Sequence, residues 1–174
     1  MTTELRYALE ARLAGDALLN GMLDRDPNVP GSPRPAILSW HMGTAPPPVT
    51  CLTYRLCTLT PDGRFEDARP GTDAAVDANS PITDLRVDFE SWTQKASSKY
   101  HENIFGRLLA LLGNQAWFVP KLSATGAYDP AGTPVARVFK GNCLSAQPNL
   151  YDDKLNARLG LYSFRFRVTR LPKS

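Results

Sequence analysis

The chain has 174 residues, a length that suits one domain of ordinary size. Apolar residues make up 43% of it, enough to fill a single core, which argues against a wholly disordered chain. Its 20 basic and 17 acidic side chains leave a formal charge of only +3, far from the basic surface of a dedicated nucleic-acid-binding protein, and no apolar run is long enough to cross a membrane.

The first half of the chain predicts one helix and several short strands. Leucines at every fourth position predict an amphipathic helix over residues 3–14, which Gly15 ends. Asp16 then caps a short second helical turn. After a proline-rich turn region, residues 36–40 form a short strand candidate.

The next region combines strands with a long irregular stretch. Three consecutive prolines at 46–48 predict a stiff extended segment, with a PxxP-type peptide ligand as the weaker alternative. Residues 49–58 predict a strand. A turn at Asp62 and Gly63 would join this strand to residues 64–66 as a hairpin. Residues 60–81 as a whole show no sustained periodicity, and such long loops in a compact domain usually have a function.

The middle of the chain carries its clearest strand-to-helix pattern. Residues 82–93 alternate strictly between apolar and charged side chains, which predicts a strand with one buried face. Ser97 or Ser98 then caps a helix that extends through Leu112 and ends at Gly113.

The second half predicts further strands separated by loops. A short strand at 116–119 precedes a loop over 120–134, and residues 135–147 form one strand with a bulge at Gly141. The segment 149–157 is a connecting turn or a single helical turn. The last strand, 158–170, places aromatic residues on one face and arginines on the other.

This order of elements predicts an α+β fold in a single domain over residues 1–174. We expect an antiparallel β-sheet with two main helices packed on one face and long loops, the longest at about 60–81 and another at about 115–134. The second face of the sheet carries arginines and carboxylates, so it must meet solvent or a partner.

Three cysteines, Cys51, Cys57 and Cys143, form an odd set without a CxxC pair. This pattern favours reduced, mostly buried thiols in an intracellular protein. Cys51 and Cys57 would share one face of a strand about 20 Å apart, too far for a disulfide.

The sequence contains no set of reactive side chains in a pattern that indicates catalysis. The only histidines are His41 and His101, no GxSxG elbow is present, and we expect His101 to be an exposed helix residue. Metal-ligand spacings and phosphate-binding glycine loops are missing as well. We therefore predict no catalytic residue, no metal, no cofactor and no enzymatic activity.

The arginines of the last strand have two interpretations. Arg165 and Arg167 share a face that could contact phosphates. However, Asp84, Asp88 and Glu90 lie on the comparable face of another strand, and cross-strand ion pairs would neutralise the arginines there. The ion pairs are the favoured interpretation.

Four segments of the chain form a characteristic series of elements: the opening LRYALEARLAGDALLNGML, the proline-rich PRPAILSWH, the strand-then-helix unit LRVDFESWTQKASSKYHENIFGRLLALL, and the closing NLYDDKLNARLGLYSFRFRV. This series resembles the tail-completion and tail-terminator proteins of long-tailed bacteriophages. The resemblance covers roughly residues 4–170 as a pattern of elements, without a signature motif. The stretches 60–81 and 115–134 are larger than a minimal member of the family would have.

The resemblance implies a structural protein of the virion. Such proteins form a ring, usually a hexamer, at the head-proximal end of the tail tube, where they stop tube polymerisation and join the tail to the head connector. The implied partners are further copies of the chain, the tail tube protein and the head–tail connector or neck protein, with transient contact to genomic DNA in the lumen and no membrane. The implied location is the tail or neck of a virion assembled in the host cytoplasm.

Loops that become ordered against a neighbour would suit such a ring. We therefore expect that deleting residues 67–80 leaves a folded monomer that no longer assembles. The interface candidates are Arg64, Phe65, Glu66, Asp67, Arg69, Arg86, Asp88, Arg165 and Arg167.

Two alternatives belong to other classes. One is a head-completion or connector adaptor protein of the neck, which would bind the portal side. The other is a non-viral small binding module, or a small enzyme with an unmarked pocket.

Overall fold

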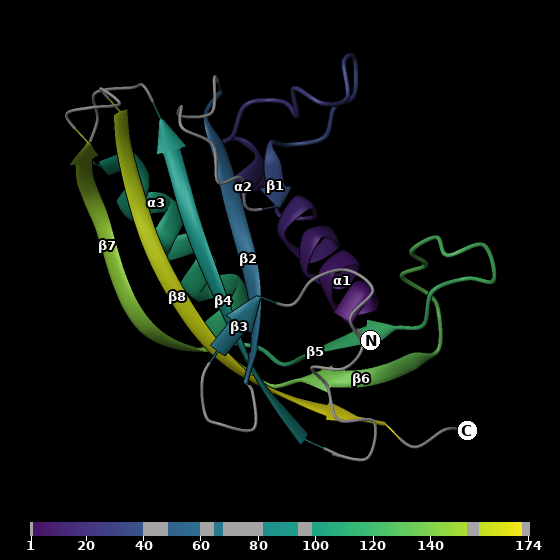
Figure 1. Ribbon diagram of the computed structural model, residues 1–174. Helices are drawn as coiled ribbons and strands as arrows, with labels where there is room; N and C mark the ends of the chain where they lie inside the picture. The colour runs from purple at the N-terminus through teal and green to yellow at the C-terminus, as the bar shows by residue number, and fades with distance from the viewer. Residues whose placement is uncertain are drawn as a thin grey trace.

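A computed structural model describes residues 2–39, 49–59, 65–67, 82–93, 99–152 and 157–171. Within these residues eight strands form one curled sheet, and the long strands β2, β4, β8 and β7 run side by side (Figure 1). The helices are α1 (Thr2–Ala14), α2 (Ala17–Asn20) and α3 (Lys99–Leu108). The strands are β1 (Ile37–Ser39), β2 (Cys51–Leu59), β3 (Phe65–Asp67), β4 (Ile82–Thr93), β5 (Trp117–Pro120), β6 (Pro134–Val138), β7 (Asn142–Asp152) and β8 (Ala157–Arg170).

The sheet is antiparallel except at one edge. Its strand order is β1-β2-β4-β8-β6-β5, with β3 paired to β2 and β7 paired to β8, and only β1 runs parallel to its neighbour. Every residue of β4 has a partner on β8, from Ile82 opposite Thr169 to Thr93 opposite Arg158. The predicted α+β class is therefore confirmed, and the two halves of the central ladder come from segments far apart in the sequence.

Alternation along the strands separates a buried inner face from a charged outer face. On β4 the inner residues Leu85, Val87 and Phe89 are 3%, 1% and 1% exposed. On β8 the aromatic residues that were predicted to share a face are all buried as well. α1 and α3 pack on this same inner face, because their buried leucine and isoleucine side chains join the sheet residues in one core. Burial of this apolar surface supplies the main driving force for folding.

Gly15 and Asp16 end α1 and begin α2 as the sequence predicts. The side chain of Asp16 accepts a hydrogen bond of 2.7 Å from the backbone N–H of Leu19, which satisfies a free donor at the start of α2. Asp16 also pairs with Arg107 of α3. That contact with Arg107 lowers the pKa of the Asp16 carboxyl, so one acidic residue both caps a helix and joins it to α3.

The predicted helix through Leu112 changes its geometry in the last turn. Residues Leu109–Gly113 form a π-helical turn after α3. There the carbonyl oxygen of Leu111 accepts from Arg12 Nε at 2.9 Å, and that of Leu112 accepts from the Gly141 N–H at 2.6 Å. Partners from distant segments thus satisfy the terminal carbonyls, which explains how the wider turn is stabilised.

The strand predicted over residues 135–147 with a bulge at Gly141 is interrupted at residues 139–141 and is not continuous. The chain forms β6 and then β7, and both lie along the same edge of β8. Between them, a Cβ on Gly141 would lie 2.5 Å from the ring of Phe166, so the chain turns closely over that buried ring at a residue without a side chain.

The predicted turn over residues 149–157 begins too early, and residues 153–156 lie outside the described part of the chain. β7 continues through Asp152 and β8 begins at Ala157. Exposed polar residues on an edge strand resemble a turn in the sequence, because only one side of that strand is buried.

Several sequence predictions fall outside the described residues. They are the extended prolines at 46–48, the turn at Asp62 and Gly63, the helix cap at Ser97 or Ser98, and most of the stretch 60–81. The hairpin itself is confirmed, since Phe65, Glu66 and Asp67 pair with Leu59, Thr58 and Cys57. In the described part of the chain, no helix has the length and apolar character needed to span a membrane.

Gly160 makes room for a buried tyrosine, and this predicts a sensitive position. A Cβ there would lie 2.7 Å from Ser91 Oγ and closer still to Tyr162 Oη. We expect Gly160→Ala to lower the free energy of unfolding by about 1–3 kcal/mol, measured by urea denaturation, because it overpacks the core and displaces a buried hydroxyl.

Gly106 in α3 provides the matched control, because a Cβ there would have no atom within 4 Å. Gly106→Ala should stabilise the protein by about 0.5–1 kcal/mol through helix propensity. Similar effects of the two substitutions would contradict this packing argument.

Candidate interaction surface

The outer face of the sheet brings charged residues of three strands into register. Arg55 of β2 lies opposite Asp88 of β4, which lies opposite Ser163 of β8. In the next row Cys57 lies opposite Arg86, which lies opposite Arg165. Period-two alternation in all three strands places these polar groups on the face that α1 and α3 do not cover.

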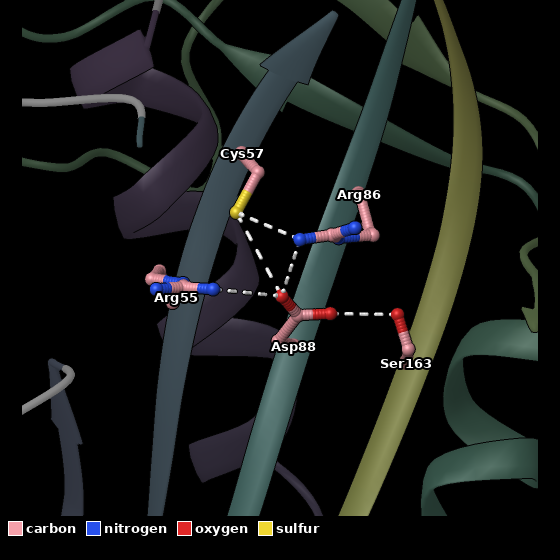
Figure 2. Close-up of polar contacts among 5 residues, drawn as sticks. All are labelled: Arg55, Cys57, Arg86, Asp88 and Ser163. Atoms are coloured by element: carbon pink, nitrogen blue, oxygen red, sulfur yellow. Dashed lines mark hydrogen bonds and ion pairs between the residues drawn. The ribbon is translucent and has the colours of Figure 1, made fainter. Parts of the chain in front are cut away.

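Asp88 is the centre of the polar contacts on this face (Figure 2). Its Oδ2 lies 3.1 Å from Arg86 Nη2 and 3.4 Å from Arg55 Nη2. Its Oδ1 accepts a hydrogen bond of 2.6 Å from the hydroxyl of Ser163. The Asp88 side chain is only 19% exposed, so two guanidinium groups and a hydroxyl replace much of its water.

Cys57 lies against the same carboxylate but is not arranged as a nucleophile. Its Sγ is 3.8 Å from Asp88 Oδ2 and 3.9 Å from Arg86 Nη2. Burial, and next the negative charge of Asp88, raises the pKa of the Cys57 thiol. Because the thiolate is the reactive form, this site favours an inert, packed thiol. Cys51 is buried and free as well, whereas Cys143 is free and exposed, so two of the three thiols are buried.

A second ion pair lies nearer the end of the sheet. Arg165 Nη2 is 2.6 Å from Asp84 Oδ2, and Arg165 is the more exposed of the two partners. Arg167 lies directly opposite Asp84 in register and is exposed. The favoured interpretation of the arginines is therefore confirmed for Arg165, which pairs with a carboxylate of the neighbouring strand as predicted.

The expectation that His101 is exposed is wrong. His101 has no exposed surface, and its Nδ1 lies 2.7 Å from Ser91 Oγ, which lies 3.0 Å from Tyr162 Oη. The Tyr162 hydroxyl donates a bond of 2.8 Å to the backbone carbonyl of His101. The first turn of α3 packs on the inner face of the sheet here, which a single histidine beside polar residues does not reveal in the sequence.

The direction of these hydrogen bonds argues against a serine nucleophile. Tyr162 uses its one proton on a carbonyl oxygen, so Ser91 must donate to Tyr162, and His101 must donate its Nδ1–H to Ser91. A catalytic histidine has to accept the serine proton instead. Ser91 is also 0% exposed, so no substrate can reach it in this conformation. The network holds α3 on the sheet.

The predicted interface residues are only partly brought together. Arg86, Asp88, Arg165 and Arg167 share the outer face of β4 and β8. Phe65, Glu66 and Asp67 form β3, which extends the hairpin from β2. Arg64 and Arg69 lie outside the described residues.

Sequence reasoning missed Arg55 and Ser163, which complete the contacts of Asp88. Alternation in residues 49–58 places Arg55 on the same face as Cys57, but only the pairing of β2 with β4 brings it to Asp88. Alternation likewise places Ser163 on the arginine face of the last strand, but only the register of β8 against β4 shows that its partner is Asp88.

A groove of about 660 Å³ lies beside α1 and β5. Trp117, Phe118 and Tyr128 line it, and the guanidinium of Arg12 lies 5.9 Å from the centre of the Trp117 ring. Its lining is mixed, because the polar side chains of Arg12, Asp16 and Gln115 accompany the aromatic ones. The Asp16 carboxyl, whose pKa is lowered, is already engaged by Arg107 and by the N–H of Leu19. Among the described side chains, no group of three or more histidine, cysteine or carboxylate residues is arranged to hold a metal ion.

Comparison with known proteins finds no match for this chain. No protein-family model matches the chain, and neither the curated proteins nor the solved structures contain a significant match.

The two carboxylates of the outer face should differ in their contribution to stability. Asp88→Asn removes the charge that holds Arg55, Arg86 and Ser163, so we expect a loss of about 1–3 kcal/mol in the free energy of unfolding. Asp84→Asn removes one pair with a well-exposed arginine and should cost less than about 1 kcal/mol. Urea denaturation of both variants measures the difference, and equal losses would contradict the central role of Asp88.

Burial of His101 predicts a loss of stability in acid. Desolvation, together with the charge of Arg158, lowers the pKa of His101 from 6.5 to about 4. Between these values the unfolded chain binds more protons than the folded chain. The free energy of unfolding should therefore fall as the pH falls from 6.5 towards 4, by up to about 1.4 kcal/mol per pH unit.

His101→Asn tests this, because an amide N–H can take the place of the Nδ1–H on Ser91 without titrating. The difference in urea midpoint between pH 7 and pH 5 should become smaller in the variant. An unchanged difference would assign the acid sensitivity to other groups.

Proposed function

We propose that this protein is a structural subunit of a ring at the head-proximal end of a bacteriophage tail tube. The ring ends tube polymerisation and joins the tail to the head connector. In this role the protein carries out no catalysis, binds no cofactor and is located in the tail or neck of the virion.

The observation that carries the proposal is the one-sided coverage of the sheet. α1 and α3 occupy the inner face, whereas the outer face of β2, β4 and β8 is charged and has no described helix over it (Figure 1). A large, preformed and polar face of this kind suits contact with another folded protein. The inert thiol of Cys57 and the inward-directed Ser91 network suit a structural role better than a chemical one.

A closed ring needs two different surfaces on each subunit, joined by a rotation. The charged outer face offers one. The edge strand β7 offers a second, because within the described residues it pairs only with β8. Leu144 and Tyr151 of this strand are 51% and 52% exposed. Exposed apolar side chains on an edge strand are a ready site for pairing with another chain.

The proposed partners follow from the place of such a ring. One surface of the ring meets the tail tube protein and the opposite surface meets the connector or neck protein. The lumen has to let genomic DNA pass, so some charged residues of each subunit face DNA.

The mass of the purified protein by light scattering, alone and with tail tubes, tests the ring. We expect a discrete ring, or a monomer that forms one on the tube end and halts tube growth. Deletion of residues 68–80, which leaves β3 intact, should give a folded monomer that does not assemble.

An edge variant tests where the subunits meet. Leu144→Lys with Tyr151→Lys should remain monomeric, because two charges would be buried at the contact. The matched control adds the same charges at Leu18 and Val29, which are 63% and 41% exposed on other segments, and it should assemble normally. A wild-type monomer that does not respond to tubes would contradict the proposed function and favour a connector adaptor or another binding module.

A further inference from the structure

A basic groove lies on the outer face where β6 gives way to β7 along the edge of β8. Its volume is about 600 Å³, and the polar residues that line it are Asp84, Lys140, Asn142, Arg165, Arg167 and Thr169. β4, β8 and the β6–β7 connection each contribute to it. It therefore exists only in the folded chain, and no local motif marks it.

The groove has an excess of positive charge. The lining contains three basic side chains, those of Lys140, Arg165 and Arg167, and one carboxylate, that of Asp84. Its formal charge is therefore +2. Asp84 Oδ2 is already bound to Arg165 at 2.6 Å. Lys140 and Arg167 are exposed, and no carboxylate in the described part of the chain forms an ion pair with either. Since the whole chain has a net charge of only +3, the groove holds a marked concentration of positive charge.

Two hydrogen bonds hold the backbone around the groove. The N–H of Phe139 donates to the carbonyl oxygen of Arg167 at 2.9 Å, and that of Gly141 donates to Leu112 at 2.6 Å. Lys140 thus lies between two anchored residues, next to Arg167. The guanidinium of Arg137 stacks 5.0 Å from the centre of the Phe139 ring, which places a further cation beside the groove.

We propose that this groove binds the phosphodiester backbone of duplex DNA. Arginine presents donors in a planar fork that matches phosphate oxygens, and the Asn142 amide and the Lys140 ammonium supply further donors. Contacts of this kind carry no sequence information, so the binding is non-specific and decreases steeply with salt. The choice of duplex DNA rests on the proposed function, in which DNA passes through the ring.

The binding is tested with a fluorescent duplex of about 30 base pairs, followed by anisotropy between about 50 and 200 mM salt. If Lys140, Arg165 and Arg167 each neutralise one phosphate, the logarithm of the affinity should fall with the logarithm of the salt concentration with a slope of about −2 to −3. Lys140→Gln with Arg167→Gln should lower the affinity about tenfold at low salt and make the slope shallower by about 2. Both residues are exposed, and circular dichroism checks that the variant is folded.

The control removes the same charge elsewhere. Arg25 and Lys121 are exposed and lie outside the groove lining, so Arg25→Gln with Lys121→Gln should change the affinity less than about twofold. Equal losses in the two double variants, or no binding by the wild-type chain at the lowest salt, would overturn the proposal. Displacement of the duplex by polyglutamate at equal charge concentration would also overturn it and indicate a site for acidic protein segments.

Light scattering separates this proposal from the ring. A wild-type ring without DNA binding would overturn the groove assignment and leave the proposed function intact. DNA binding by a chain that never forms a ring would support the groove as a DNA-binding site and contradict the terminator role. The protein would then meet DNA outside a tail.

Discussion

The pairing of β4 with β8 is the contact on which the rest of the structure depends. It joins two long segments from the middle and the end of the chain over every residue of β4. β2 is added on one side of this pair, and β6 and β7 on the other. Because side chains alternate with a period of two, this one register decides which residues enter the core and which face outwards. A slip by one residue would exchange the two faces.

The two faces satisfy their polar groups in different ways. On the inner face Ser91, His101 and Tyr162 are joined by hydrogen bonds with one donor for each contact. On the outer face the Asp88 carboxylate binds two guanidinium groups at the centre of the sheet. Towards the β6–β7 junction, Lys140 and Arg167 are exposed and add positive charge. The centre is therefore built for stability, and the periphery is available for partners.

This division explains why groups that resemble reactive ones do not form an active site. A serine beside a histidine and a cysteine beside an arginine both occur, yet burial and the direction of the hydrogen bonds make each pair part of the packing. The features that remain open to solvent are a charged face, an exposed edge strand and a basic groove. All three suit recognition of other macromolecules, which is the requirement of a subunit in a larger assembly.

The sequence by itself determined the elements whose signal is local. The alternation in residues 82–93 predicted β4 with its bounds, and leucine spacing predicted α1 and the core of α3, because one buried face imposes a regular period on the residues of that element. The opposition of acidic and basic strand faces also predicted cross-strand ion pairs, and the pair of Asp84 with Arg165 is one of them. Tertiary structure alone decided the rest. The close approach of Gly141 to the ring of Phe166, the burial of His101 against Ser91 and Tyr162, and the basic groove all depend on segments that meet only in the folded sheet. These outcomes follow from contacts between residues far apart in the chain, and periodicity within one segment contains no information about its distant neighbours.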